Sequence, residues 1–222
     1  MRRSEINNYI REAKEFFSLN HFFLPAWAYY SPEDWKGKYE EMSEIIENSL
    51  GWDLTDFGSN NFKTRGLILF TIRNGNSIRD QKPYCEKIMI AGGKQETPMH
   101  FHKVKMEDII NRGGGILEIE FFKSNPDGTF SENEFVVKID GQARRLSPGE
   151  LVQLHPGQSV CMESGVYHRF YGVDAPVLVG EVSTVNDDTN DNIFYEEIGR
   201  FPLIEEDEAP LHLLVTDYRN YL

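Results

Sequence analysis

The sequence predicts a mainly β protein, a barrel or sandwich of short strands that follows a helical N-terminus. From about residue 65, short runs rich in β-branched and aromatic residues recur at regular intervals. Clusters of Gly, Asn, Asp and Pro separate these runs. The first fifty residues instead repeat apolar side chains at helical spacing. Regular short strands without helices between them indicate a sandwich or barrel rather than alternating βα units.

Two helices are expected in the first fifty residues. Ser4 suits the N-cap of a helix whose apolar face comprises Ile6, Tyr9, Ile10, Ala13, Phe16 and Phe17. The segment Ser31-Pro32-Glu33-Asp34 predicts the start of a second helix, which continues toward Leu50. It offers a cap, a proline in the first turn and acids at the positive end of the helix dipole. His21 and the aromatic residues between the helices are expected to pack.

The strands are expected over residues 67–73, 84–90, 116–122, 134–139, 151–154, 159–162, 167–171 and 177–182. At 222 residues the chain has enough length for one compact unit with a real core. We therefore expect a helical extension over 1–60, a β-barrel with a metal site over 61–200, and a C-terminal segment over 201–222 that closes over the barrel.

Composition restricts the partners and the location of the protein. The net charge of −13 repels nucleic acid and anionic membrane surfaces, so a neutral small molecule is the expected partner. The first residues begin no apolar run of signal-peptide length, and no stretch approaches a membrane span, so we expect a cytoplasmic protein. Cys85 and Cys161 form no Cys-x-x-Cys pair and are expected to be reduced. A homodimer is expected, because small barrels often cover an edge strand with a partner.

Two histidines separated by one residue mark the candidate metal site. Alternation along an extended chain places His100 and His102 on the same face, so two imidazoles can reach one ion. Glu107 follows five residues later, and Gly113–Gly115 would form a tight turn that returns the next strand beside the first. His168, at the start of a later strand in Gly165-x-x-His168, supplies the fourth ligand. His155 precedes Pro156-Gly157 and is ranked below His168 as a turn residue, and His212 is expected to be structural.

Three imidazoles and one carboxylate form a mixed nitrogen and oxygen set suited to Mn, Fe, Co, Ni or Zn. The absence of thiolates argues against a closed structural zinc site. Four protein ligands around an octahedral ion would leave two positions for water or substrate. The residues therefore favour a catalytic metal site over ordinary strand histidines.

The pattern His100-x-His102-x4-Glu107-x6-Gly114 resembles the first cupin motif, and Gly165-x-x-His168 resembles the core of the second. Glu163 and Gly172 stand where that second motif usually has proline and asparagine. A narrower resemblance, to the bacterial D-lyxose isomerases, extends over nearly the full length. It is carried by Pro98-Met99-His100-Phe101-His102, the run from Glu107 to Gly115, Gly180-Glu181-Val182-Ser183 and Val185-Asn186-Asp187-Asp188.

This resemblance implies a cupin barrel, also called a double-stranded β-helix or jelly roll, with Mn²⁺ as cofactor. Co²⁺, Fe²⁺ and Zn²⁺ are alternatives. The implied reaction is the metal-dependent interconversion of the free sugars D-lyxose and D-xylulose, and also of D-mannose and D-fructose, through a cis-enediol.

Charged residues within apolar strands are the candidates for proton transfer and substrate binding. They are costly to bury, so they face either water or a polar pocket. Lys87 is the expected hydroxyl-proton donor or charge stabiliser. If residues 201–222 close over the barrel mouth, Glu206 could act as general base. The expected substrate contacts are Glu118, Glu120, Glu181 and Asp187.

Three other functions remain open at this point. An Fe(II)-dependent cupin dioxygenase would use the same four ligands. A sugar-phosphate isomerase would need a basic cradle, for which Arg112, Arg144, Arg145 and Arg169 are the candidates. A sugar-binding cupin without catalysis would hold its metal and interconvert no sugar.

Overall fold

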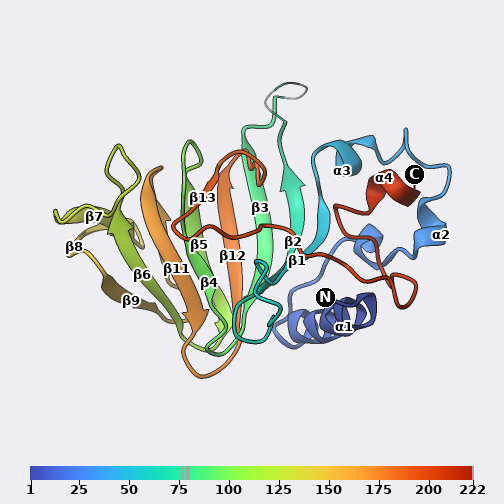
Figure 1. Ribbon diagram of the computed structural model, residues 1–222, viewed down its shortest axis with the longest axis horizontal. Helices are drawn as coiled ribbons and strands as arrows, with labels where there is room; N and C mark the ends of the chain where they lie inside the picture. The colour runs from blue at the N-terminus through green and yellow to red at the C-terminus, as the bar shows by residue number, and fades with distance from the viewer. Residues whose placement is uncertain (77, 79–80, 222) are drawn as a thin grey trace.

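The computed structural model describes residues 1–76, 78 and 81–221, which form two antiparallel sheets and a helical layer (Figure 1). The helices are α1 (Arg3–Leu19), α2 (Pro32–Trp35), α3 (Ser43–Glu47) and α4 (Tyr218–Tyr221), with a 3-10 turn at Ala26–Tyr29. The strands are β1 (Gly51–Thr55), β2 (Leu67–Asn74), β3 (Tyr84–Ala91), β4 (Thr97–His102), β5 (Glu107–Gly114), β6 (Leu117–Lys123), β7 (Phe135–Ile139), β8 (Gln142–Leu146), β9 (Glu150–Leu154), β10 (Ser159–Met162), β11 (Val166–Gly172), β12 (Val177–Thr184) and β13 (Asn192–Phe194).

The two sheets enclose the main core of the protein. The larger sheet has the order β1-β2-β3-β12-β5-β10-β7-β8, and the smaller has the order β13-β4-β11-β6-β9. Apolar side chains from both sheets meet between them, among them Leu69, Met89, Ile119, Phe121 and Val179. Alternation directs every second residue of each strand into this space. The fold class predicted from the sequence, a mainly β jelly-roll barrel with an N-terminal helical extension, is confirmed.

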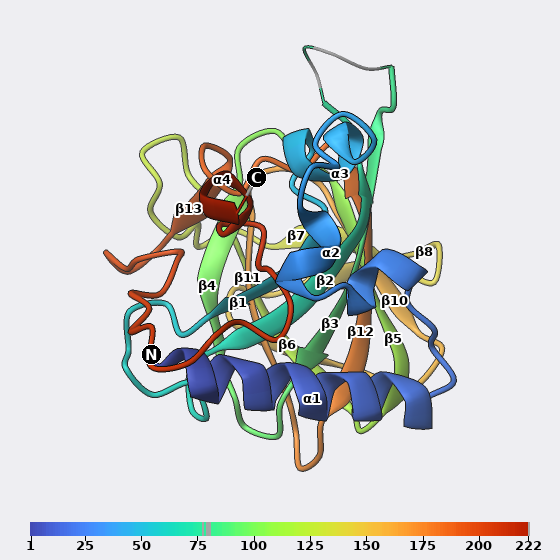
Figure 2. The same cartoon turned by 90° about the vertical axis from the view of Figure 1, so that its right-hand side faces the viewer.

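A second core lies between α1 and the outer face of β1, β2 and β3 (Figure 2). Ile6, Ile10 and Phe17 of α1 are fully buried there. Strand β2 is covered on both faces, because Leu67 and Leu69 point into the barrel while Ile68 and Phe70 face the helix. Its unbroken apolar sequence therefore reflects burial on two sides rather than amphipathic alternation.

The helical extension differs from the expectation in two respects. The predicted second helix is divided into α2 and α3, because Gly37, with φ +71°, follows the C-cap residue of α2. The capping box of Ser31 with Asp34 is present at the start of α2. The larger sheet also begins at β1, inside the range expected to be helical. The barrel therefore starts about ten residues earlier than the predicted boundary at 61.

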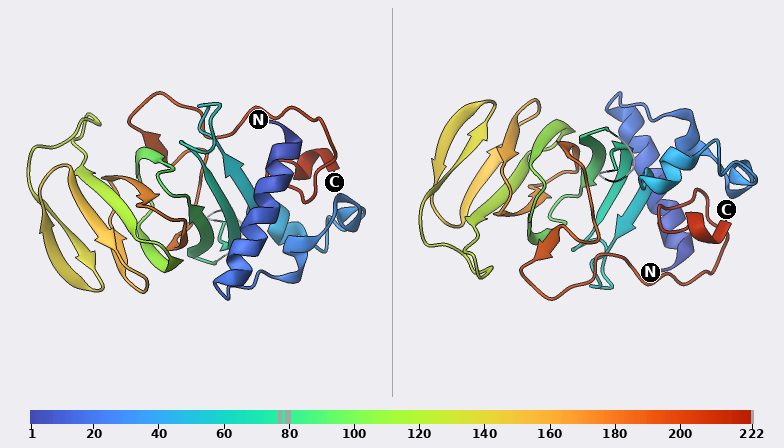
Figure 3. Two further views of the ribbon diagram at one scale, coloured as in Figure 1. Left: turned by 90° about the horizontal axis from the view of Figure 1, so that it is seen from below. Right: turned by 90° about the horizontal axis from the view of Figure 1, so that it is seen from above.

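The C-terminal segment lies on the helical end of the molecule, opposite β7, β8 and β9 (Figure 3). Arg3 of α1 holds it with hydrogen bonds to Glu206 and Asp217. Trp52 of β1 also forms a bridge with Leu214. The segment thus packs on α1 and β1, and that it closes over the barrel stays a prediction. None of the helices in the part of the chain that the structure describes is long and apolar enough to cross a membrane.

The sheets end in four edge strands, β1, β8, β9 and β13. β8 is largely exposed, and Leu151 of β9 is an exposed apolar residue. These are the strands that a partner could cover, and the homodimer stays a prediction.

Candidate active site

The four predicted ligands come together inside the barrel. His100 and His102 lie on β4, Glu107 begins β5, and His168 lies on β11 opposite His100 in the sheet register. One ring nitrogen from each histidine lies within 4.8 Å of the other two. Glu107 Oε1 lies 3.3 Å from His102 Nε2 and 3.1 Å from His168 Nε2. All four side chains are buried.

Backbone carbonyls determine which histidine nitrogens face the centre. His100 Nδ1 lies 2.8 Å from the Pro98 carbonyl oxygen, and His168 Nδ1 lies 3.1 Å from that of Val166. A carbonyl can only accept, so each ring carries a proton on Nδ1 and turns Nε2 toward the other ligands. For His168, Nε2 faces the Glu107 oxygen. A metal ion between these two buried atoms, or a proton on Nε2, stabilises this contact.

The surroundings of His100 and Glu107 shift the pKa values of both side chains toward the forms that bind a cation. Burial lowers the pKa of His100 well below its ordinary value, and His168 and His102 lower it further, so this ring is neutral. Burial alone would raise the pKa of Glu107, but Lys105 and His102 hold it well below its usual range. The carboxylate is therefore charged. Its buried Oε1 atom has no hydrogen-bond partner among the described residues.

This donor set fits a divalent transition metal. Imidazole nitrogens and a carboxylate oxygen are ligands that bind such ions, and the structure brings them close together. Asp191 Oδ2 lies 3.5 Å from His102 Nδ1, where it can orient the third ring. The His100, His102 and His168 group can therefore hold a metal ion, with Glu107 beside it.

A buried network of lysines and carboxylates continues from Glu107 along the barrel wall. Lys105 Nζ lies 2.8 Å from Glu107 Oε2 and 2.8 Å from Glu181 Oε1, so it joins a ligand to the next carboxylate. Lys87 Nζ lies 3.5 Å from Glu181 and 3.6 Å from Asp188, and it donates a 2.7 Å hydrogen bond to Asn186. Lys87 faces Glu181 across the β3–β12 register.

The charges of this network hold each other in the ionised state. Burial alone would lower the pKa of Lys105, but Glu107 and Glu181 raise it above its ordinary value. Burial would likewise raise the pKa of Glu181, but Lys105 and Lys87 lower it. Glu181 is therefore a carboxylate inside the barrel, able to accept a proton from a bound molecule.

These groups line a narrow cavity of about 40 Å³. Its polar lining comprises the ligands together with Lys87, Lys105, Glu181, Asp188 and Arg200. Its apolar lining comprises Phe57, Leu67, Leu69, Met89, Ile109, Phe170 and Phe194. Polar groups that converge beside apolar ones can hold a small polar molecule in one orientation.

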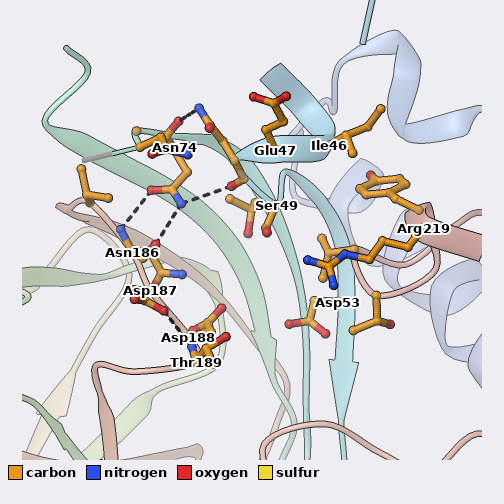
Figure 4. A pocket seen from close by; sticks show the side chains of 18 of the residues that line it. Ile46, Glu47, Ser49, Asp53, Asn74, Asn186, Asp187, Asp188, Thr189 and Arg219 are labelled. Atoms are coloured by element: carbon orange, nitrogen blue, oxygen red, sulfur yellow. Dashed lines mark hydrogen bonds between the residues drawn. The ribbon is translucent and has the colours of Figure 1, made fainter. Parts of the chain in front are cut away.

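A larger cleft of about 890 Å³ adjoins this cavity (Figure 4). Asp188 lines both the cleft and the cavity. Asn74, which also lines the cleft, donates to the Asn186 carbonyl and accepts from its N–H. The side chain of Asn186 in turn accepts from Lys87. The floor of the cleft is thus hydrogen-bonded to the charged wall of the cavity.

The structure places Lys87 and Glu181, two of the predicted site residues, at the cavity. Glu118 and Glu120 lie elsewhere, because Leu117, Ile119 and Phe121 occupy the inward positions of β6. Glu118 instead accepts from Tyr171 and Gln153, and Glu120 pairs with Arg169. Asp187 lines the cleft and caps the turn at Thr189 and Asn190. Its neighbour Asp188 enters the cavity.

Glu206 lies away from the cavity, in the segment that packs on α1. Its carboxylate accepts from Arg3 Nε at 2.8 Å and Nη2 at 2.6 Å.

We expect Glu206→Gln to retain at least half of the wild-type turnover and to lower the urea midpoint of unfolding, because it weakens a contact of the buried Arg3. Steady-state kinetics and urea titration measure both quantities. A loss of turnover above 100-fold would return Glu206 to the mechanism.

Sequence reasoning missed Lys105 and Arg200. Lys105 lies on the segment between His102 and Glu107, and its only sequence signal was that position among the ligands. Arg200 belongs to the irregular chain after β13, where no periodicity indicates which way a side chain points.

The arginines considered for a phosphate cradle mostly have carboxylate partners of their own. Three of its candidates pair with carboxylates: Arg144 with Glu150, Arg145 with Glu134 and Arg169 with Glu120.

Comparison with known proteins adds independent findings. The profile of a family described as D-lyxose isomerase matches residues 1–218. A D-lyxose/D-mannose isomerase of Escherichia coli O157:H7 is 42% identical, and one of Serratia proteamaculans is 41% identical, each over 100% of both chains. An L-ribose isomerase of Cellulomonas parahominis has a similar fold, with a TM-score of 0.62 at 17% identity over 92% of this chain and 98% of that one. The L-ribose isomerase mutant of Acinetobacter sp. DL28 has a TM-score of 0.61 at 16% identity, with the same coverage.

Proposed function

Because the chain belongs to the D-lyxose isomerase family, and is thus an aldose–ketose isomerase, we propose that it interconverts D-lyxose with D-xylulose and D-mannose with D-fructose. The observation that carries this proposal is the buried charged carboxylate of Glu181 beside a metal-binding group in one small cavity. A free sugar is the proposed substrate class, since Lys87 and Lys105 on the cavity wall already pair with the carboxylate of Glu181.

The proposed cofactor is a divalent ion held by His100, His102, Glu107 and His168, with Mn²⁺ as the preferred metal. Once bound, such an ion supplies Lewis-acid polarisation of the sugar carbonyl and of the oxygens that become negative during the reaction. Lys105 keeps Glu107 ionised for this task through its 2.8 Å contact with Oε2, while Oε1 faces the histidines.

The isomerisation requires a proton to leave C2 of the open-chain aldose and a proton to be added at C1. We assign both transfers to Glu181. Its contacts with Lys105, Lys87 and Ser183 all involve Oε1, so Oε2 is the atom that would take the proton from C2 and return it to C1 of the cis-enediol. The hydroxyl proton moves from O2 to O1 in the same step.

Lys87 is the proposed group for the hydroxyl proton. Its ammonium is buried and held between Glu181, Asp188 and Asn186, so it can donate toward an oxygen of the sugar without changing position. Lys105 has no such freedom, because it bridges the ligand Glu107 and the base Glu181. We therefore separate a proton-donating lysine from a lysine that positions the carboxylates.

An isomerase assay over free aldoses, with Mn²⁺ restored after metal analysis, tests this proposal. We expect turnover concentrated on D-lyxose and D-mannose. No oxygen should be consumed during turnover, which separates the isomerase from an iron-dependent dioxygenase with the same ligands. Full metal occupancy without interconversion of any aldose would instead indicate a sugar-binding protein and contradict the proposal.

A further inference from the structure

We propose that Arg200 is a specificity-determining residue, which donates a hydrogen bond from Nη1 to a sugar hydroxyl beyond C2. This inference rests on the proposed isomerase function and names the group that recognises the non-reacting part of the sugar. The predicted candidates for catalysis and substrate contact did not include Arg200.

The guanidinium of Arg200 has one occupied arm and one unoccupied arm. Nη2 donates to Asp53 Oδ2 at 2.6 Å and lies 3.3 Å from Asp188 Oδ2. Nη1 is fully buried and has no hydrogen-bond partner among the residues that the structure describes. A buried N–H of a charged group without an acceptor is costly. An acceptor supplied by a bound molecule removes that cost.

Arg200 is placed where the unoccupied arm can serve the substrate cavity. Arg200 lines the narrow cavity with the histidines. Asp53 and Asp188 line the large cleft (Figure 4), and Asp188 lines the narrow cavity as well. The ion pairs of Arg200 with these two carboxylates therefore form part of the wall between cavity and cleft. Because both carboxylates hold Nη2, the orientation of the planar guanidinium is restricted before any sugar binds.

Most other charged groups on the cavity wall already have partners. Lys87 contacts Asn186, Glu181 and Asp188, and Lys105 contacts Glu107 and Glu181. Thr97 Oγ1 and Asn192 Oδ1 on the same wall also lack partners among the described residues, but both are neutral. A hydrogen bond from a charged donor is stronger than one between neutral groups, so Arg200 has the largest expected contribution.

The charge around Arg200 indicates which acceptor it takes. One positive guanidinium lies between two carboxylates, and Lys87 near Asp188 brings the local sum to zero. Such a neutralised arginine gives little attraction to a phosphate, which needs net positive charge. It can still donate to a neutral hydroxyl. The expected ligand is therefore the hydroxyl of an unphosphorylated aldose.

Arg200→Lys tests the proposal, because it keeps a cation between Asp53 and Asp188 but removes the second arm of the guanidinium. We expect kcat/KM for D-lyxose to fall about 10- to 100-fold, which is the effect of losing one hydrogen bond from a charged donor. For the 3-, 4- or 5-deoxy analogue that lacks the contacted hydroxyl, the variant should lose less than about threefold, as in a double-mutant cycle. Metal content and melting temperature should stay unchanged.

Arg65→Lys is the matched control, because Arg65 also joins two carboxylates, Glu96 and Glu196, but does not line the cavity. Its kcat/KM should equal that of the wild type for all four sugars. Equal losses of Arg200→Lys on D-lyxose and on all three deoxy analogues, or no loss on any sugar, would overturn the proposal for Arg200 alone. A wild-type protein inactive on every free aldose would overturn the isomerase function as well. If Arg200→Lys is unstable, Arg200→Met with the same sugar comparison decides the question.

Discussion

Glu181→Gln is expected to lower kcat about 10²- to 10⁴-fold, the range that a positioned general base contributes. The amide has nearly the same shape and can still accept from Lys105, which lies 2.8 Å from Oε1. It cannot take a proton from C2. The metal ligands are unchanged, so metal content measured by elemental analysis should equal that of the wild type.

Solvent exchange distinguishes loss of the base from a general disturbance of the site. In D₂O, the wild-type enzyme should introduce deuterium at the carbon that receives the proton in those turnovers in which protonated Glu181 exchanges with solvent before it returns the proton. NMR of the sugar measures this directly. Glu181→Gln should introduce none above background. Glu134→Gln, on an exposed glutamate that precedes β7, serves as the control and should behave as the wild type. Exchange at the wild-type rate in Glu181→Gln would assign the base to another residue.

Removal of the metal by chelation is expected to abolish turnover and to lower the melting temperature by about 5–10 °C. A bound ligand at 100 times its Kd stabilises the folded state by about 2.7 kcal/mol. For a chain of this size, each kcal/mol corresponds to roughly 2–4 °C. The structural reason is the close pair of buried ligand atoms, Glu107 Oε1 and His168 Nε2, which lie 3.1 Å apart. Addition of Mn²⁺ should restore both activity and melting temperature, as measured by calorimetry.

His168→Ala provides the corresponding genetic test. It removes one ligand, so the purified protein should contain less than about a tenth of the wild-type metal and show turnover near background. His155→Ala is the control, because His155 is exposed in a turn in which Gln158 hydrogen-bonds its backbone. Full metal content and activity in His168→Ala would contradict the assignment of this histidine.

Several features of the site could be predicted because they depend on local geometry. Strand alternation is a property of the extended chain, so His100-x-His102 and the inward position of Lys87 between apolar neighbours were open to sequence reasoning. The same rule could not decide for Glu118 and Glu120. Alternation places both on one face of β6 but does not say which face points into the barrel. In the structure, Leu117, Ile119 and Phe121 occupy the barrel side.

For residues in irregular segments, no repeating pattern in the sequence predicts the direction or the partner of a side chain. The acidic run at 205–208 showed only that charges cluster there, and the observed partner of Glu206 is Arg3, 203 residues away in sequence. Which surface this segment covers depends on the complementary charge of Arg3 and on the packing of Leu214 beside Trp52. Asp187 and Asp188 likewise differ only in how one turn directs their side chains.

By itself, the sequence determined the β-barrel class, the four candidate ligands and, through resemblance, the family. These depend on spacing, residue type and similarity along the chain. Only the tertiary structure decided that Lys105 joins Glu107 to Glu181, that Glu206 lies outside the site, and that Arg200 lies between Asp53 and Asp188. Each of these contacts joins residues whose pairing depends on the packing of separate elements. The spacing thus indicated a group that can hold a metal, and the fold placed charged neighbours beside it.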